Sequence, residues 1–247
     1  MDGKEQELLA QVLDLFASEF AEKALLRGGM VLKVMGSARY TNDLDYLFVP
    51  YKSKNDITDQ ILACLKKIEG NEISYTLNSK CLRVIVALKG VSIQIEAKVA
   101  LEMKSTVIST RLFSPQFNLP KRLIHIVDHS VSLANKLAAW NERRLARDLY
   151  DIWFFLQMQI VPDAETLLNR LRKPLYSKLV KKEQHFRGKS IPEFYDFLRF
   201  QVGNLTDKEI EDQLSDYLAP EELAGLVSLI RSALVRLEAQ PSKRTSP

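Results

Sequence analysis

The feature that most constrains this chain is a glycine pair followed, after a short spacer, by two aspartates at the start of an apolar run. The glycines are Gly28 and Gly29, and the run over residues 43–49 begins with Asp43 and Asp45, separated by one leucine. In a β-strand, residues i and i+2 lie on the same face of the sheet. The two aspartates are therefore predicted to point one way while the apolar residues face a core.

This arrangement favours a site for a metal ion and a polyphosphate. Two carboxylates side by side resist ionisation, and a divalent cation removes that conflict. Mg²⁺ and Mn²⁺ prefer oxygen ligands, so Asp43 and Asp45 are candidate metal ligands. Glycines let a backbone approach phosphates closely, and the N-terminus of a following helix favours anions, which makes Gly28 and Gly29 a candidate phosphate-binding turn. Either motif alone is more often a solvated strand end or an ordinary turn.

A third carboxylate is expected on a later strand. Residues 91–99 alternate, with apolar side chains on one face and Ser92, Gln94, Glu96 and Lys98 on the other. Glu96 would then share a sheet face with Asp43 and Asp45 and complete the metal site. The alternative is an ordinary exposed strand glutamate.

The chain changes character near residue 128. Before it, strand-like runs mix with amphipathic helical segments, the strands lying at 43–49, 72–77, 82–88 and 91–99. After it, helical periodicity dominates over 129–158, 164–182, 191–201, 207–217 and 220–238. We therefore predict an α+β fold with a mixed sheet flanked by helices over residues 1–127. A helical bundle over 128–240 and a disordered tail over 241–247 are expected to follow.

Composition narrows the class of protein without naming a function. The chain has 247 residues, 46% of them hydrophobic and 27% charged, with a formal net charge of +4. These values are typical of a globular protein, and the mild basicity permits a nucleotide or nucleic-acid partner without requiring one. Two cysteines, Cys64 and Cys81, are expected to be reduced thiols. With no signal-peptide pattern and no apolar run of membrane-spanning length, we expect a cytoplasmic protein with no membrane partner.

A second constellation lies in the helical half, over residues 133–153. If this segment is one helix, Lys136, Arg143, Arg147 and Asp151 follow each other at intervals of seven, four and four residues and form one stripe. A stripe of cations beside a metal site would hold a polyphosphate. The alternative is a solvated helix face on which Arg147 and Asp151 form an i, i+4 ion pair.

The two constellations together resemble the nucleotidyltransferase family that includes the AbiEii toxins of abortive-infection toxin–antitoxin systems. That family is similar to minimal polymerase β-like nucleotidyltransferases with an added helical domain. The resemblance covers roughly residues 20–155. It is carried by Gly28-Gly29, Asp43-Leu44-Asp45, Lys136, Arg143, Arg147-Asp148 and Asp151.

The resemblance implies a nucleotidyltransferase-like fold and a Mg²⁺- or Mn²⁺-dependent transfer of a nucleoside monophosphate from an NTP to an acceptor hydroxyl. The expected metal ligands are Asp43, Asp45 and Glu96. With Lys136, which would neutralise the leaving pyrophosphate, they form the expected catalytic set. The nucleotide is expected to contact Gly28, Gly29, Lys136, Arg143, Arg147, Asp148 and Asp151, the two last either orienting the cations or receiving the base or ribose.

One position departs from the family pattern. Ser or Thr usually follows the glycine pair, where its hydroxyl meets a phosphate, and this chain has Met30. Losing one neutral hydrogen bond would weaken nucleotide binding by roughly 0.5–1.5 kcal/mol, too little to abolish catalysis. Met30→Ser is then expected to raise nucleotide affinity, unless Met30 is a core residue of an apolar helical run.

The acceptor and partners are expected from the same resemblance. A toxin of this kind would act on RNA, such as a tRNA end, or on a protein hydroxyl, and would have a cognate antitoxin. A basic segment interleaved with aromatic residues could meet an RNA backbone, its cations being Arg172, Lys173, Lys178, Lys181, Lys182, Arg187 and Lys189. A solvated basic face is the alternative.

Two other functions fit the same motifs. A catalytically silent nucleotidyltransferase fold could bind a nucleotide or a partner protein, which Met30 favours and the aspartate pair disfavours. A small-molecule nucleotidyltransferase of the antibiotic-modifying type would need a narrow, acidic cleft, whereas a broad basic groove would favour RNA.

Overall fold

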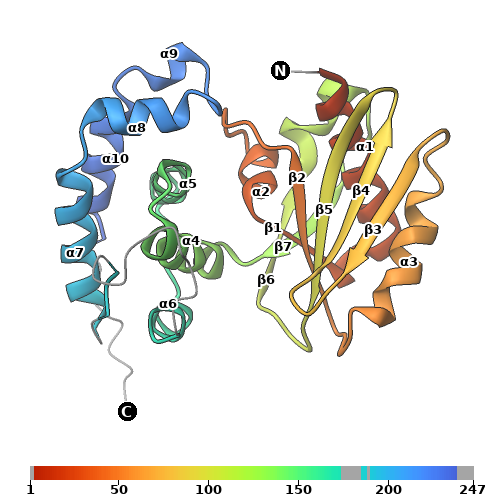
Figure 1. Ribbon diagram of the computed structural model, residues 1–247, viewed down its shortest axis with the longest axis horizontal. Coiled ribbons are helices and arrows are strands. Elements are labelled where there is room, and N and C mark those ends of the chain that lie inside the picture. The colour runs from red at the N-terminus through yellow and green to blue at the C-terminus, as the bar shows by residue number, and fades with distance from the viewer. Residues whose placement is uncertain (1–2, 174–184, 188–189, 238–247) are drawn as a thin grey trace. The chain divides into compact units, whose positions relative to one another are not determined.

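The computed structural model describes residues 3–173, 185–187 and 190–237 (Figure 1). The chain divides into two compact units, Met1–Asp128 and His129–Pro247. The first unit contains the sheet and the second contains helices.

A seven-stranded mixed sheet forms the first unit, in the order β3-β4-β5-β2-β1-β7-β6. Its strands β2–β5 and β1–β7 pair in parallel, and the other neighbouring strands pair antiparallel. The strands are β1 (Ala24–Arg27), β2 (Asp43–Phe48), β3 (Glu72–Leu77), β4 (Leu82–Leu88), β5 (Val91–Val99), β6 (Ser105–Ser109) and β7 (Leu123–Val127). The predicted α+β fold with a mixed, helix-flanked sheet is confirmed.

Helices cover the sheet on the side where its apolar residues lie. Figure 1 shows α1 and α3 on the same side of the sheet. Phe16 of α1 packs its ring on Tyr46 and Phe48 of β2, and Phe20 packs edge-on against Phe48. The helical elements of this unit are α1 (Gly3–Phe20), α2 (Gly29–Val34) and α3 (Asn55–Leu65), with short 3₁₀ turns at Ala21–Lys23, Thr110–Leu112 and Ser114–Phe117.

The strand alternation decides where the acidic residues lie. Because Tyr46 and Phe48 face the α1 side, Asp43 and Asp45 must lie on the opposite face of β2. In the parallel pair β2–β5, Asp45 is in register with Glu96. Three acidic residues therefore share one sheet face, away from the core under α1.

Three strands were not anticipated from the sequence. The segment at β1 has four residues, and β6 and β7 flank a stretch interrupted by prolines, so none shows a long alternation. By contrast, the predicted strands at 82–88 and 91–99 are present as β4 and β5, and they form a hairpin with Lys89 and Gly90 at φ 50° and 85°. Positive φ at both turn residues suits the twist of a two-residue hairpin.

In the part of the second unit that the structure describes, helices pack on one another. Helix α4 packs on α5 and α6, and α10 packs on α5 and α7, with Trp140, Phe155 and Phe194 fully buried. The helices are α4 (His129–Arg143), α5 (Ala146–Gln157), α6 (Ala164–Leu171), α7 (Ile191–Gly203), α8 (Asp207–Leu214), α9 (Pro220–Leu223) and α10 (Leu226–Val235). The expected helical stretch at 174–182 and the tail at 241–247 lie outside the described residues.

Two of the expected helices are each divided in the structure. The segment 220–238 divides at Gly225, which has φ 74°, into α9 and α10. The segment 129–158 breaks at Arg144, which has φ 54°, and Leu145 is extended before α5 begins. The guanidinium of Arg144 lies over the Trp140 ring at 4.0 Å and near the Phe197 ring at 4.9 Å. Burial lowers the pKa of Arg144 to about 10, so it stays charged at neutral pH. Arginine is not a residue type that marks the end of a helix in a sequence, so this break at a left-handed backbone position could not be predicted.

Among the helices that the structure describes, none is both long and apolar enough to span a bilayer.

Leu13→Ala should destabilise the first unit by about 2–5 kcal/mol, because Leu13 is buried in α1 and its loss leaves a cavity. Leu101→Ala is the matched control, since this leucine is 62% exposed and the same change should cost less than about 0.5 kcal/mol. Urea unfolding followed by circular dichroism measures both. Equal losses would contradict the core position of α1.

Candidate functional site

The glycine pair forms a turn directly beside the second aspartate. Gly28 follows β1, whose last residue, Arg27, is paired with Asp45 of β2. Gly28 has φ 77° and ψ −156°, a conformation that is largely restricted to glycine. A Cβ on Gly28 would lie closer than 3.0 Å to the Asp45 Oδ2 atom, a separation that side chains do not tolerate. The absence of a side chain at Gly28 is therefore what allows the carboxylate to reach the turn.

At the second glycine, two other side chains occupy the space that a Cβ would need. A Cβ on Gly29 would overlap Nη2 of Arg39 and would lie 3.1 Å from Oγ1 of Thr41. Arg39 and Thr41 are both buried, in the loop between α2 and β2. Helix α2 is only six residues long, so any anion at this turn would rest on the backbone and these side chains more than on a helix dipole.

The two aspartates share one face of β2 and are both half-buried. Oδ1 of Asp43 accepts a hydrogen bond of 2.7 Å from the Thr41 hydroxyl. Asp45 points at the Gly28 backbone, as the Cβ overlap shows. Each carboxylate is thus oriented by a different part of the loop and turn.

Glu96 is on the expected face but its carboxylate is engaged by an arginine. Arg83 of β4 lies opposite Glu96 and donates to Oε1 from Nη2 at 2.7 Å and from Nε at 3.2 Å. These hydrogen bonds raise the pKa of Arg83. Within the described part of the chain, no three acidic, histidine or cysteine side chains are arranged to hold a metal ion. A three-carboxylate centre therefore stays a prediction.

Met30 is a core residue. Its side chain is fully buried in α2, among the apolar residues Val31, Leu32 and Val34. A serine at this position would leave a cavity and a buried hydroxyl, so the expectation that Met30→Ser improves nucleotide binding loses its basis. The hydroxyl next to the glycine turn belongs to Thr41 instead.

In the second unit, Lys136 is held by two fully buried aspartates. Its Nζ atom lies 2.5 Å from Oδ2 of Asp151 and 3.9 Å from Oδ1 of Asp148. Both aspartates have no exposed side-chain surface, whereas the side chain of Lys136 is 17% exposed. Of these three side chains, only that of Lys136 reaches solvent.

Arg143 completes a balanced set of two cations and two anions. Its Nε atom donates to Oδ2 of Asp148 and its Nη2 atom donates to Oδ1, each at 2.7 Å, which is a bidentate geometry. This pairing raises the pKa of Arg143. Because an unmatched buried charge costs several kcal/mol, the four side chains depend on each other. We call this set the buried ion cluster: Lys136, Arg143, Asp148 and Asp151.

The predicted stripe along one helix is wrong in its geometry. Helix α4 ends at Arg143, so Arg147 and Asp151 lie on α5 and the ion pairs join two helices. Nη1 of Arg147 bonds to the hydroxyl of Tyr217 at 3.3 Å, and its guanidinium lies 5.7 Å from that ring. Asp151 pairs with Lys136, an interaction that spacing along one helix could not reveal.

Only part of the basic segment falls within the described residues. Arg172, Lys173 and Arg187 are exposed, and Lys178, Lys181, Lys182 and Lys189 lie outside. The neighbouring Phe186 is buried, and its backbone N–H donates to Asn141 Oδ1 at 2.9 Å.

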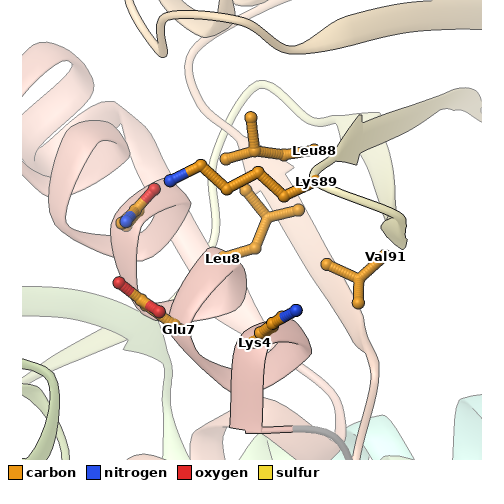
Figure 2. Close-up of a pocket in the computed structure, with 7 residues that line it drawn as sticks. Lys4, Glu7, Leu8, Leu88, Lys89 and Val91 are labelled. Carbon is orange, nitrogen blue, oxygen red and sulfur yellow. The ribbon is translucent and has the colours of Figure 1, made fainter.

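Two cavities in the first unit lie at α1 and are not lined by any of the candidate site residues. Figure 2 shows the smaller, of 180 Å³, where Leu8 of α1 lies near Leu88 and Lys89 of the β4–β5 hairpin. The larger, of 580 Å³, shares Gln11, Leu88 and Lys89 with it.

Sequence reasoning gave no role to Arg39, Thr41, Arg83 or Tyr217. For Thr41 a signal existed, because a hydroxyl two residues before an aspartate can bond to it locally. Arg83 becomes visible only once the register of β4 and β5 is known.

Gly28→Ala should destabilise the first unit by more than Gly70→Ala. Both glycines have positive φ, 77° and 75°, so each alanine carries a backbone cost of about 1–3 kcal/mol. At Gly70 the added Cβ meets only Leu88 at 3.9 Å, whereas at Gly28 it must displace Asp45. Urea unfolding compares the two variants. Equal losses would mean that Asp45 moves aside at no cost.

Known structures share the fold. MenT4, a nucleotidyltransferase toxin of Mycobacterium tuberculosis H37Rv, has a TM-score of 0.59 and 15% identity, covering 97% of this chain and 84% of that chain. JHP933 from Helicobacter pylori has a TM-score of 0.53 and 16% identity, with coverage of 97% and 96%. A putative nucleotidyltransferase from H. pylori has a TM-score of 0.54 and 15% identity, with coverage of 98% and 100%.

These TM-scores establish a common fold. No curated protein sequence matches the chain significantly. The family described as nucleotidyl transferase AbiEii toxin, type IV toxin–antitoxin system, matches residues 11–223, which include the glycine turn, both aspartates and the buried ion cluster. The resemblance expected from the sequence is confirmed: the chain belongs to the AbiEii nucleotidyltransferase toxin family.

Proposed function

We propose that this nucleotidyltransferase transfers a nucleoside monophosphate from an NTP to an acceptor hydroxyl with the help of Mg²⁺ or Mn²⁺. The observation that carries the proposal is the fit of Asp45 against Gly28, with Asp43 on the same face of the strand. Because Gly28 has no side chain, the backbone of the turn lies next to the Asp45 carboxylate. A triphosphate and a cation require both kinds of group.

The donor set suits a hard divalent cation. Asp43 and Asp45 would hold it, and Glu96 would join them if its carboxylate were released from Arg83. Oxygen ligands from half-exposed carboxylates leave room for the phosphate and water ligands that Mg²⁺ usually keeps. When bound, the metal would stabilise negative charge on the attacking and leaving oxygens.

The proposed reaction is an in-line displacement at the α-phosphorus. The acceptor oxygen forms a bond to that phosphorus, the bond to the β-phosphate oxygen breaks, and pyrophosphate leaves. The acceptor proton passes to a carboxylate, for which Glu96 is the candidate, or to solvent. Backbone groups at Gly28 and Gly29 would hold the phosphates.

Lys136 is proposed to neutralise the charge that grows on pyrophosphate. Its ammonium has three donors, and its close partner in the buried ion cluster is Asp151. The buried aspartates would hold the Lys136 side chain in one orientation, and Asp148 would orient Arg143 in the same way. Arg147 is proposed to contact the nucleotide from its place beside Tyr217.

The acceptor is proposed to be RNA, such as a tRNA end, or a protein hydroxyl. The family is described as the toxin of a type IV toxin–antitoxin system, which also implies an antitoxin partner. Exposed Arg172, Lys173 and Arg187 support contact with a phosphate backbone.

A second candidate function is nucleotide binding without transfer. The ion pair between Glu96 and Arg83 favours it, because both guanidinium hydrogen bonds occupy Oε1 and leave one oxygen of the carboxylate for a metal ion or a proton. Incubation with each labelled NTP, Mg²⁺ and either total RNA or lysate separates the two functions. Transferred label supports the enzyme; bound nucleotide without transfer supports the alternative.

Asp45→Asn should reduce label transfer by more than about 100-fold, since even residues that merely orient metal ligands are worth about 10–100-fold. Stability should change by less than about 1 kcal/mol, because Asp45 is half-exposed. Asp59→Asn is the matched control, an exposed aspartate on α3 whose change should leave transfer intact. An unfolded Asp45→Asn protein would show a structural role instead.

Lys136→Met should destabilise the second unit by about 3–5 kcal/mol, because it leaves buried aspartate charge unmatched. Adding Asp151→Leu should recover most of that loss, since removing both charges avoids the penalty. Thermal unfolding measures both variants. The recovered double variant should still lack transfer; full activity in it would exclude Lys136 from the reaction.

A further inference from the structure

The loop between α2 and β2 links the glycine turn to the aspartates and is fixed at several points. The Ser37 N–H donates to the Leu32 carbonyl at 2.9 Å, and the Arg39 N–H donates to Ser37 Oγ at 3.2 Å. Arg39 then packs its guanidinium against Gly29. The loop therefore cannot shift without disturbing the turn.

The other end of the loop is anchored by α1. Gln6 Nε2 donates to the Thr41 carbonyl at 3.0 Å, and the Tyr40 hydroxyl donates to Glu5. Thr41 itself is 5% exposed. With its backbone fixed from α1 and its side chain buried, Thr41 presents its hydroxyl in one place.

That hydroxyl is bonded to Asp43. The 2.7 Å hydrogen bond to Oδ1 restricts rotation of the carboxylate and occupies one of its two oxygens. A neutral donor does this without cancelling the charge, whereas a cation at the same place would compete with a metal. Groups that orient metal ligands in this way commonly decide metal affinity.

We propose that Thr41 is a positioning residue that sets the Asp43 carboxylate for cation binding. This inference rests on the proposed function, since it requires that Asp43 holds a metal. It assigns to Thr41 the task of fixing the ligand, and to α1 and Arg39 the task of fixing Thr41.

The test is direct Mn²⁺ binding in the presence of a non-hydrolysable NTP analogue, measured by the electron paramagnetic resonance signal of free Mn²⁺. Thr41→Val removes the hydroxyl and should weaken Mn²⁺ binding by about tenfold or more. Thr41→Ser keeps the hydroxyl and should bind within about threefold of the parent. Unchanged binding by Thr41→Val would overturn the inference.

A matched control separates positioning from general destabilisation. Thr58 on α3 is also buried, and its hydroxyl donates to the Lys54 carbonyl at 2.8 Å. Thr58→Val makes the same chemical change away from the aspartates and should leave Mn²⁺ binding unchanged. If Thr58→Val weakens binding as much as Thr41→Val at a similar loss of thermal stability, the role of Thr41 is structural and the inference fails.

The outcomes also distinguish this inference from the proposed function. If the parent and Asp45→Asn bind Mn²⁺ equally poorly, the metal site fails and the role of Thr41 fails with it. If the parent binds, Asp45→Asn does not, and Thr41→Val does, only the role of Thr41 is lost. In transfer assays, Thr41→Val should raise the Mn²⁺ concentration for half-maximal rate about tenfold while largely restoring kcat at saturation. A fall in kcat alone would contradict positioning.

Discussion

The close approach of Asp45 to Gly28 is the constraint on which the first unit's candidate site depends. It requires a residue without Cβ, a positive φ at the end of β1 and the antiparallel register of β1 with β2. The positive φ is costly for any residue other than glycine. Together these features bring a carboxylate to a backbone turn, an arrangement that packing of the core does not require.

The same turn constrains the loop that follows it. Gly29 has no room for a side chain because Arg39 and Thr41 occupy that space. The hydroxyl that lies beside this turn is that of Thr41, and it donates to Asp43. Met30, the residue directly after the glycine pair, packs in the core.

The sequence predicted elements whose residues alternate over a full strand, but not those fixed by distant partners. The alternation around Asp43 and Asp45 and over β5 predicted that Glu96 shares their sheet face, and the structure shows it in register with Asp45. The sequence pattern could not show that Arg83 forms an ion pair with Glu96, because the register between two strands is not encoded in either strand alone. Helical spacing placed Lys136 and Asp151 on one face of a single helix, whereas in the structure they lie on two helices and form an ion pair between them.

The two aspartate pairs of this chain differ in their burial and in the groups that contact their carboxylates. Asp148 and Asp151 are fully buried and matched by Lys136 and Arg143, which makes them parts of the scaffold that hold cations in place. Asp43 is half-exposed and receives a hydrogen bond from a neutral hydroxyl, so its charge is oriented and still available. A carboxylate that is held in one orientation and stays accessible can bind a cation from solution, whereas a carboxylate matched by cations inside the protein is already neutralised.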